Sequence, residues 1–120
     1  MKVLLVVDER LMQKFFCDTF KHLFGEQDTT ILVAESLREA RVFTERPLVD
    51  LDLILIDSRL GPELTFGLIP EIKLVYGGPL VAISADEYEH PEKIRLGCTH
   101  ASNRDIFDFL SKRKFEIANF

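Results

Sequence analysis

The chain has 120 residues, of which 15 are Lys or Arg and 20 are Asp or Glu, giving a formal net charge of −5 at pH 7. This length suits one domain, and the hydrophobic fraction of 47% is enough for a folded core, which excludes a disordered chain. The negative charge argues against direct nucleic-acid binding, because such binding needs a basic surface.

The cysteines and the N-terminus indicate the compartment. Cys17 and Cys98 lie far apart and lack the spacing of a metal site, so we expect reduced thiols. The apolar run that begins the chain stops at Asp8, which is too early for a signal-peptide core or a membrane span. The sequence therefore predicts a cytoplasmic protein without membrane attachment.

Strand and helix patterns alternate along the chain. Short continuous apolar runs are typical of buried strands, and apolar side chains at spacings of three and four residues are typical of helices. In chain order we expect a strand at 2–7, a helix at 12–24, a strand at 29–34, a helix at 36–45, a strand at 52–57, a helix from 66 or 67 to 76, a strand at 80–83, a short helix ending at 97, a strand at 98–102 and a last helix from 103 or 105. The alternation predicts one α/β domain over residues 1–120, with a doubly wound parallel sheet and right-handed crossovers.

The strand at 52–57 is the centre of this arrangement. Its four consecutive aliphatic residues end at Asp57, and the turn residues Gly61 and Pro62 follow closely. Such a run suits a strand that is buried on both faces of a parallel sheet. Asp57 is then expected at the carboxyl end of a central strand, where ligands bind in open α/β sheets.

Chemically active groups follow most of the expected strands. They are Asp8 and Glu9 after the first strand, Asp57 after the third, Ser84 after the fourth, and Asn103 and Arg104 after the fifth. Three clustered carboxylates repel one another, so either one is protonated or a hard divalent cation such as Mg²⁺ lies among them. A carboxylate beside Mg²⁺ can attack phosphorus and form an aspartyl phosphate. Ser84 and a cation at position 104 could then each contact a phosphoryl oxygen.

This pattern resembles the receiver domain of two-component response regulators, and the resemblance covers nearly all 120 residues. The matching positions are the acidic pair Asp8 and Glu9, the acceptor position Asp57, and Ser84 followed by Ala85, where the family has Thr or Ser followed by Ala. Any one of these features alone would be weak. Together they are fairly specific.

The resemblance implies a flavodoxin-like receiver fold with five parallel strands in the order 2-1-3-4-5. It also implies that a sensor histidine kinase or phosphotransfer protein passes a phosphoryl group to Asp57. Mg²⁺ would be held by Asp8, Glu9, Asp57 and the backbone carbonyl of Arg59. Such a domain modulates a downstream effector or output domain and is not a stand-alone enzyme, although it catalyses its own phosphorylation and dephosphorylation.

The chain departs from the family where the phosphate is sensed. Arg104 followed by Asp105 aligns with the family's Lys followed by Pro, and a gap of one would place Asn103 there instead. Arg keeps the charge but is longer and planar, so it need not reproduce the contact of a compact ammonium group. Ala101 replaces the family's aromatic residue, and the segment between Ser84 and Arg104 is about two residues shorter than usual.

Two function classes therefore stay open. One is a switch in which phosphorylation of Asp57 changes a partner surface, and which requires two conformations of different affinity for the phosphate. The other is a pseudo-receiver that binds partners without phosphorylation, or a phosphorelay intermediate. Homodimerisation also stays open. An independent enzyme fits poorly, because residues 8–11 lack a Gly-rich phosphate cradle and Asp57 lacks the second aspartate of an Asp-x-Asp phosphatase motif.

Overall fold

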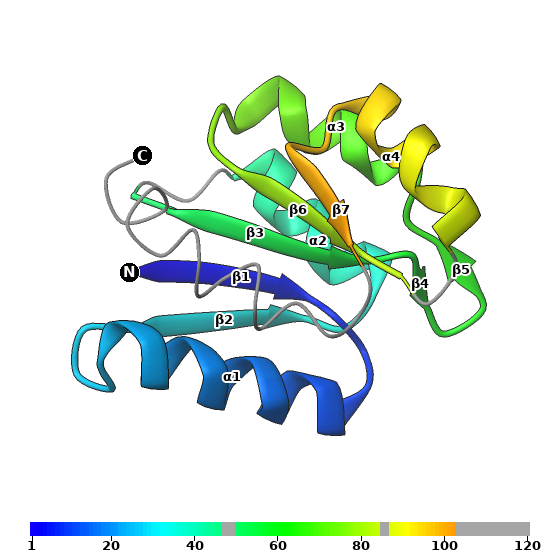
Figure 1. Cartoon of the computed structure of the whole chain (residues 1–120). Helices are drawn as coiled ribbons and strands as arrows, with labels where there is room; N and C mark the ends of the chain where they lie inside the picture. The colour runs from blue at the N-terminus through cyan, green and yellow to red at the C-terminus, as the bar shows by residue number, and fades with distance from the viewer. Residues whose placement is uncertain (47–49, 85–86, 103–120) are drawn as a thin grey trace.

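Five of the described strands form one parallel sheet. A computed structural model of the chain describes residues 1–46, 50–84 and 87–102 (Figure 1). The strands are β1 (Lys2–Val6), β2 (Thr30–Ala34), β3 (Leu53–Asp57), β6 (Leu80–Ile83) and β7 (His100–Ser102). Their order is β2-β1-β3-β6-β7 and every pairing is parallel. The first four strands confirm the predicted order 2-1-3-4.

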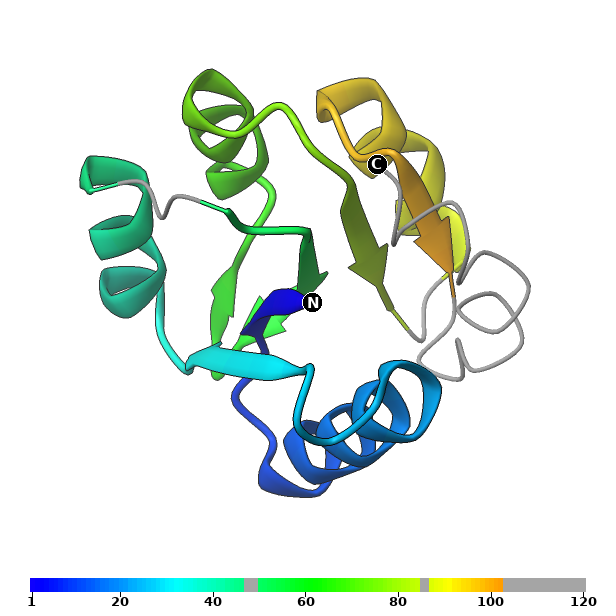
Figure 2. The same ribbon diagram turned by 90° about the vertical axis from the view of Figure 1, so that its left-hand side faces the viewer.

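The helices lie on both faces of this sheet (Figure 2). They are α1 (Arg10–Phe24), α2 (Leu37–Glu45), α3 (Leu68–Val75) and α4 (His90–Leu96), with the 3₁₀ turn η1 (Glu87–Glu89) leading into α4. Side chains of α1 pack on one face of the sheet, and side chains of α2, α3 and α4 pack on the other. No helix within the described ranges is long and apolar enough to cross a membrane.

β3 is buried on both faces, as its apolar run predicts. Leu53 and Leu55 pack with the α1 cluster, whereas Ile54 and Ile56 pack with the clusters of α2 and α3. Side chains alternate between faces along a strand, so a strand covered on both sides needs apolar residues throughout. Each such side chain contributes roughly 1.5–3 kcal/mol by leaving water. This burial holds Asp57 firmly at the end of the strand.

Local signals place the helix ends. The hydroxyl of Ser36 accepts a hydrogen bond from the backbone N–H of Glu39 at 3.1 Å and so caps the N-terminus of α2. α1 ends at Gly25, where φ is +97°, a conformation that glycine adopts at low cost. Pro70 lies in the first turn of α3, where the backbone N–H has no partner within the helix. α1 begins at Arg10, two residues before the predicted start, and β7 begins at His100, two residues after it.

The sequence missed a small hairpin directly after Asp57. β4 (Arg59–Leu60) and β5 (Glu63–Leu64) pair in antiparallel fashion around Gly61, whose φ is +61°. Two-residue strands are too short to leave a periodic pattern, so only the turn at 61–63 was predicted. Val75, the last residue of α3, remains 42% exposed. The predicted last helix, with Asn103 and Arg104, lies outside the described residues.

Candidate functional site

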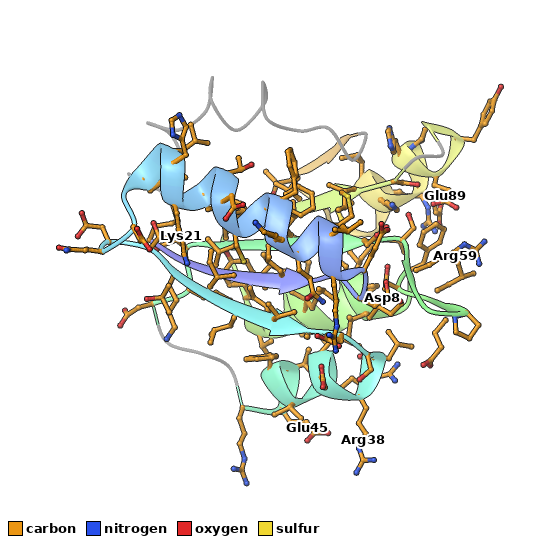
Figure 3. The ribbon with its side chains drawn as sticks, turned by 90° about the horizontal axis from the view of Figure 1, so that it is seen from below. Asp8, Lys21, Arg38, Glu45, Arg59 and Glu89 are labelled. Atoms are coloured by element: carbon orange, nitrogen blue, oxygen red, sulfur yellow. The ribbon has the colours of Figure 1, made fainter. Side chains whose placement is uncertain are left out.

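The ends of three neighbouring strands bring the predicted site residues to one edge. Asp57 is the last residue of β3 and pairs with Ile83, the last residue of β6, so Ser84 follows at the same level. Asp8 lies two residues after the end of β1. Asp57 and Ser84 are buried, with 2% and 4% of their surface exposed. In Figure 3, Asp8 lies on the same side of the molecule as Arg59 and Glu89.

Hydrogen bonds fix the backbone around Asp57. One carboxylate oxygen of Asp57 accepts the backbone N–H of Ser58 at 2.7 Å. The hydroxyl of Thr65 donates to the carbonyl of Asp57 at 2.5 Å, and the N–H of Thr65 donates to the carbonyl of Ser58 at 2.9 Å. Thr65 is completely buried. The chain therefore returns from the β4–β5 hairpin directly against the end of β3.

Asp8 is tied to the same hairpin. The backbone N–H of Gly61 donates to Oδ2 of Asp8 at 2.5 Å, and Glu9 is the exposed N-cap residue of α1. Among the described residues, no three His, Cys, Asp or Glu side chains gather closely enough to hold a metal ion. The oxygen donors of Asp8, Glu9 and Asp57 are nevertheless of the kind that Mg²⁺ prefers, and Mg²⁺ commonly takes only one or two carboxylates and keeps several waters. The donor chemistry fits a hard cation, although three ligands are not assembled.

A buried lysine lies at this edge. Lys93 of α4 is 1% exposed, and its Nζ donates hydrogen bonds to the hydroxyl of Ser58 and, at 3.1 Å, to the carbonyl of Ile83. Nζ also lies 5.8 Å from the centre of the Phe66 ring. Lysine is almost never fully buried unless its charge is paired. Lys93 thus places a positive charge beside the residues that flank Asp57.

Glu89 pairs with both Lys93 and Ser84. The hydroxyl of Ser84 donates to Oε2 of Glu89 at 3.0 Å, and Nζ of Lys93 lies 3.8 Å from the same oxygen. Burial alone would raise the pKa of Glu89. The hydroxyls of Ser58 and Ser84 and the charges of Lys93 and Arg59 outweigh it, so the pKa falls below its ordinary value. The carboxylate of Glu89 is therefore held ionised next to Ser84.

The sequence prediction overlooked Lys93 and Glu89. The predicted cation was Arg104, which lies outside the described residues. The sequence pattern did not single out Lys93, because on so short a helix its neighbour Ile94 could equally have faced the core. In the structure Leu96 packs on the core, and Lys93 precedes it by three residues on the same face of the helix. Ile94 is 46% exposed, so this apolar residue lies on the outer side of α4.

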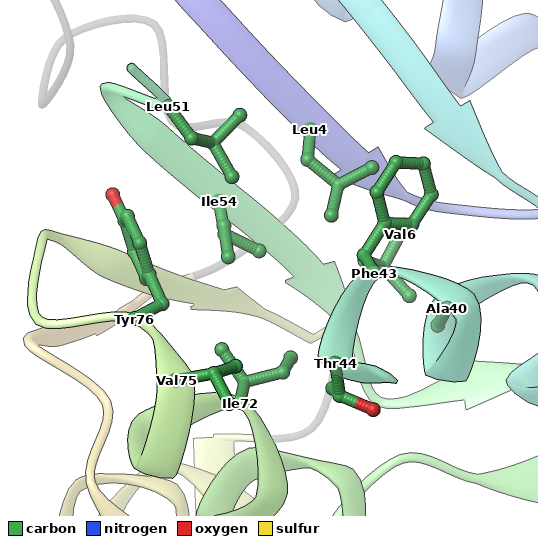
Figure 4. Close-up of a pocket in the computed structure, with 10 residues that line it drawn as sticks. All are labelled: Leu4, Val6, Ala40, Phe43, Thr44, Leu51, Ile54, Ile72, Val75 and Tyr76. Carbon is green, nitrogen blue, oxygen red and sulfur yellow. The ribbon is translucent and has the colours of Figure 1, made fainter. Parts of the chain in front are cut away.

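A separate apolar cavity lies between α2, α3 and the sheet (Figure 4). Its volume is about 20 Å³, which is room for about one water molecule. The two hydroxyls that line it are already bonded locally: Tyr76 donates to the carbonyl of Pro79 at 3.0 Å and Thr44 donates to the carbonyl of Arg41 at 2.8 Å. This cavity is a packing defect rather than a site for chemistry.

No protein-family model and no curated protein match the sequence of this chain. Solved structures do match. The signal receiver domain of a DNA-binding response regulator from Colwellia psychrerythraea 34H is 15% identical, with a TM-score of 0.82 over 100% of this chain and 99% of that chain. The phosphorylated cyanobacterial phytochrome response regulator RcpA is 16% identical, with a TM-score of 0.80 over 99% and 95%.

The Mn²⁺-bound form of response regulator Rcp1 is 17% identical, with a TM-score of 0.74 over 99% of this chain and 96% of that chain. At these identities the likeness is one of fold, and it extends over the whole length of the chain. The parallel sheet and the helices on both of its faces agree with it. The chain therefore has the fold of the receiver domains of response regulators.

Proposed function

We propose that this chain is a receiver module of two-component signalling that accepts a phosphoryl group on Asp57. The observation that carries the proposal is the position of Asp57 at the carboxyl end of the central strand, next to Ser84 and to a buried cation. A nucleophilic carboxylate needs positive charge and hydrogen-bond donors around the transferred group. Ser84 and Lys93 are groups of this kind at the same edge.

The transfer would proceed by displacement at phosphorus. An oxygen of the Asp57 carboxylate forms the new bond to phosphorus as the bond from phosphorus to the donor breaks. The electron pair of the broken bond stays with the donor, which is the ring nitrogen of a phosphohistidine or the acyl oxygen of acetyl phosphate. The product is an acyl phosphate on Asp57. The phosphohistidine donor would belong to a sensor histidine kinase or a phosphotransfer protein in the cytoplasm.

Mg²⁺ is the cation that we propose for the acidic side of the site. Asp8, Glu9, Asp57 and the backbone carbonyl of Arg59 would hold it, and it would offset negative charge on the phosphoryl oxygens. The proposal is supported by the all-oxygen donor set and by the Mn²⁺-bound form of one structural neighbour. Oδ2 of Asp8 already accepts the N–H of Gly61, so this carboxylate would share its oxygens between the hairpin and the ion.

Intact-mass measurement tests the acceptor role. We expect incubation with acetyl phosphate and Mg²⁺ to add one phosphoryl mass to the wild-type chain and none to Asp57→Ala. Asp18→Ala is the matched control, because Asp18 is an exposed aspartate on α1 and its loss leaves the edge intact. Labelling of Asp57→Ala at the wild-type level would show that another residue is modified.

One observation favours a second function, that of a binding module independent of phosphorylation. Glu89 already supplies a negative charge to Ser84 and Lys93 before any phosphoryl group is present. A permanently satisfied site of this kind could hold one partner-binding conformation. Beryllofluoride with Mg²⁺ mimics the phosphoryl group, and amide signals of residues 84–102 that do not move on its addition would favour this second function over a switch that acts on an effector or output domain.

A further inference from the structure

The buried charge of Lys93 is directed at the acceptor strand rather than at solvent. Two hydrogen-bond acceptors of Lys93 border Asp57: Ser58 is the next residue in the chain, and Ile83 is the residue paired with Asp57 across the sheet. A lysine that served only to cover the core would be expected to extend its ammonium group to water. Lys93 instead places it between the ends of β3 and β6.

Glu89 differs from Lys93 in its access to water. Its side chain is 18% exposed, whereas the side chain of Lys93 is 1% exposed. If the two lost their mutual contact, water could hydrate Glu89 in its present position, whereas the buried ammonium group of Lys93 could not be hydrated without moving. Ser84 is likewise a buried donor: it is 4% exposed, and its hydroxyl donates a hydrogen bond to Glu89. The arrangement therefore favours an exchange of anions: Glu89 leaves and another anion takes its place, while the donors Lys93 and Ser84 keep their positions.

We propose that Lys93 is the cation that pairs with the phosphoryl group on Asp57, and that Glu89 holds Lys93 and Ser84 until that group arrives. The inference rests on the proposed phosphorylation of Asp57. It assigns to a helix residue the contact that the resemblance places at Arg104. Glu89 thereby becomes an internal competitor for the phosphoryl group, and its contacts oppose the phosphorylated state.

Charge favours the exchange. Conversion of the Asp57 carboxylate to an acyl phosphate raises the negative charge at this position from one to roughly two and supplies three acceptor oxygens. Hydrogen bonds from charged donors to phosphoryl oxygens are among the strongest in proteins. A single carboxylate oxygen of Glu89, 3.8 Å from Nζ, is a weaker partner than such a group. Release of Glu89 would also break the link between Ser84 and the start of α4. Phosphorylation of Asp57 would then change the conformation of α4.

Fluorine NMR titration with beryllofluoride in the presence of Mg²⁺ tests the exchange on the full chain. We expect Glu89→Gln to lower the half-saturating beryllofluoride concentration by about threefold to tenfold, because the competing charge is removed while the side chain keeps its size. We expect Lys93→Met to raise it by about tenfold or more, as befits the loss of a hydrogen bond from a charged group. Lys93→Arg should recover part of the loss, since it keeps the charge.

Arg95→Met is the matched control. Arg95 is a cation on the same helix, but it is exposed and pairs with Glu92, so its loss should leave the half-saturating concentration unchanged. A purely structural role for Glu89 predicts weaker or equal binding in Glu89→Gln, and either result would overturn the exchange. This measurement decides the question even if Lys93→Met does not fold.

Failure of the proposed function gives a different pattern. A wild-type chain that neither gains phosphoryl mass from acetyl phosphate nor binds beryllofluoride would overturn the acceptor role of Asp57, and the present inference with it. Wild-type labelling together with unchanged binding in Glu89→Gln would overturn only the exchange. Tighter binding in Glu89→Gln and weaker binding in Lys93→Met would support both.

Discussion

Replacing Lys93 with Met should destabilise the folded chain substantially. Met keeps most of the buried aliphatic length but removes the donor of the hydrogen bonds to the hydroxyl of Ser58 and to the carbonyl of Ile83. Each hydrogen bond from a charged donor contributes about 1.5–3 kcal/mol, and a buried acceptor left unpaired adds to the loss. The apolar side chain of Met avoids the cost of burying an ammonium group and offsets part of this.

We therefore expect a net loss of about 3 kcal/mol in the free energy of unfolding. The free energy of unfolding of a native domain is typically about 5–15 kcal/mol, so the variant should still fold at 25 °C. The pair with Glu89 is 3.8 Å long, which corresponds to a direct attraction of about 4 kcal/mol at an effective dielectric constant of about 20. Desolvation cancels much of it, so the coupling between the two residues should be about 1–2 kcal/mol.

A double-mutant cycle measures both quantities. Urea unfolding of the wild type, Lys93→Met, Glu89→Gln and the double variant should be followed by circular dichroism at pH 7, because the chain has no Trp for fluorescence. Arg95→Met serves as the control, since its ion pair with Glu92 is exposed. A loss below about 1 kcal/mol in Lys93→Met, or no coupling to Glu89, would refute the reasoning, because the buried hydrogen bonds would then contribute little.

Three further predictions follow from individual side chains. Because the pKa of Glu89 is lowered in the folded chain, its stabilisation is present above the ordinary value of 4.5 and disappears as the pH falls through the folded value. Urea midpoints measured between pH 6 and pH 3 should therefore fall more steeply in the wild type than in Glu89→Gln, and parallel curves would contradict this. Burial raises the pKa of Cys98 to about 11 despite the nearby Lys93, whereas Cys17 is only half-buried. Iodoacetamide at pH 8 should therefore modify Cys17 first in the native chain and both thiols equally in urea, as peptide masses will show. Ser36→Ala should cost about 1 kcal/mol by removing the cap of α2, and Ser36→Thr should recover most of it in thermal unfolding.

The fold was predictable because its signals are local. A strand covered on both faces needs a continuous apolar run, and β3 shows this in four consecutive aliphatic residues that end at Asp57. The capping pattern of Ser36 and Glu39 likewise acts within one helical turn. The alternation of such segments then restricts the topology, because crossovers between parallel strands are right-handed. The predicted order of the first four strands was confirmed on this basis.

The site was only partly predictable. The edge residues Asp8, Asp57 and Ser84 could be found because each lies at the end of a strand or within two residues of it, and parallel strands bring their carboxyl ends together. The hairpin that ties Gly61 to Asp8 was missed, since its strands have two residues each. Whether the acidic side chains close around a cation also depends on rotamers, which no spacing rule determines.

The sequence by itself therefore determined the parallel sheet, the helices that cover it, and the acidic edge with Asp57 at its centre. Only the tertiary structure decided which cation lies at that edge. On a short helix such as α4, either Lys93 or Ile94 could have faced inward by pattern alone, since the two are neighbours in the chain. The packing of Leu96 on the core turns Lys93 inward, and the strand ends at Ser58 and Ile83 supply the acceptors that its buried charge requires. Those acceptors are far away in the sequence, and only folding brings them to the helix.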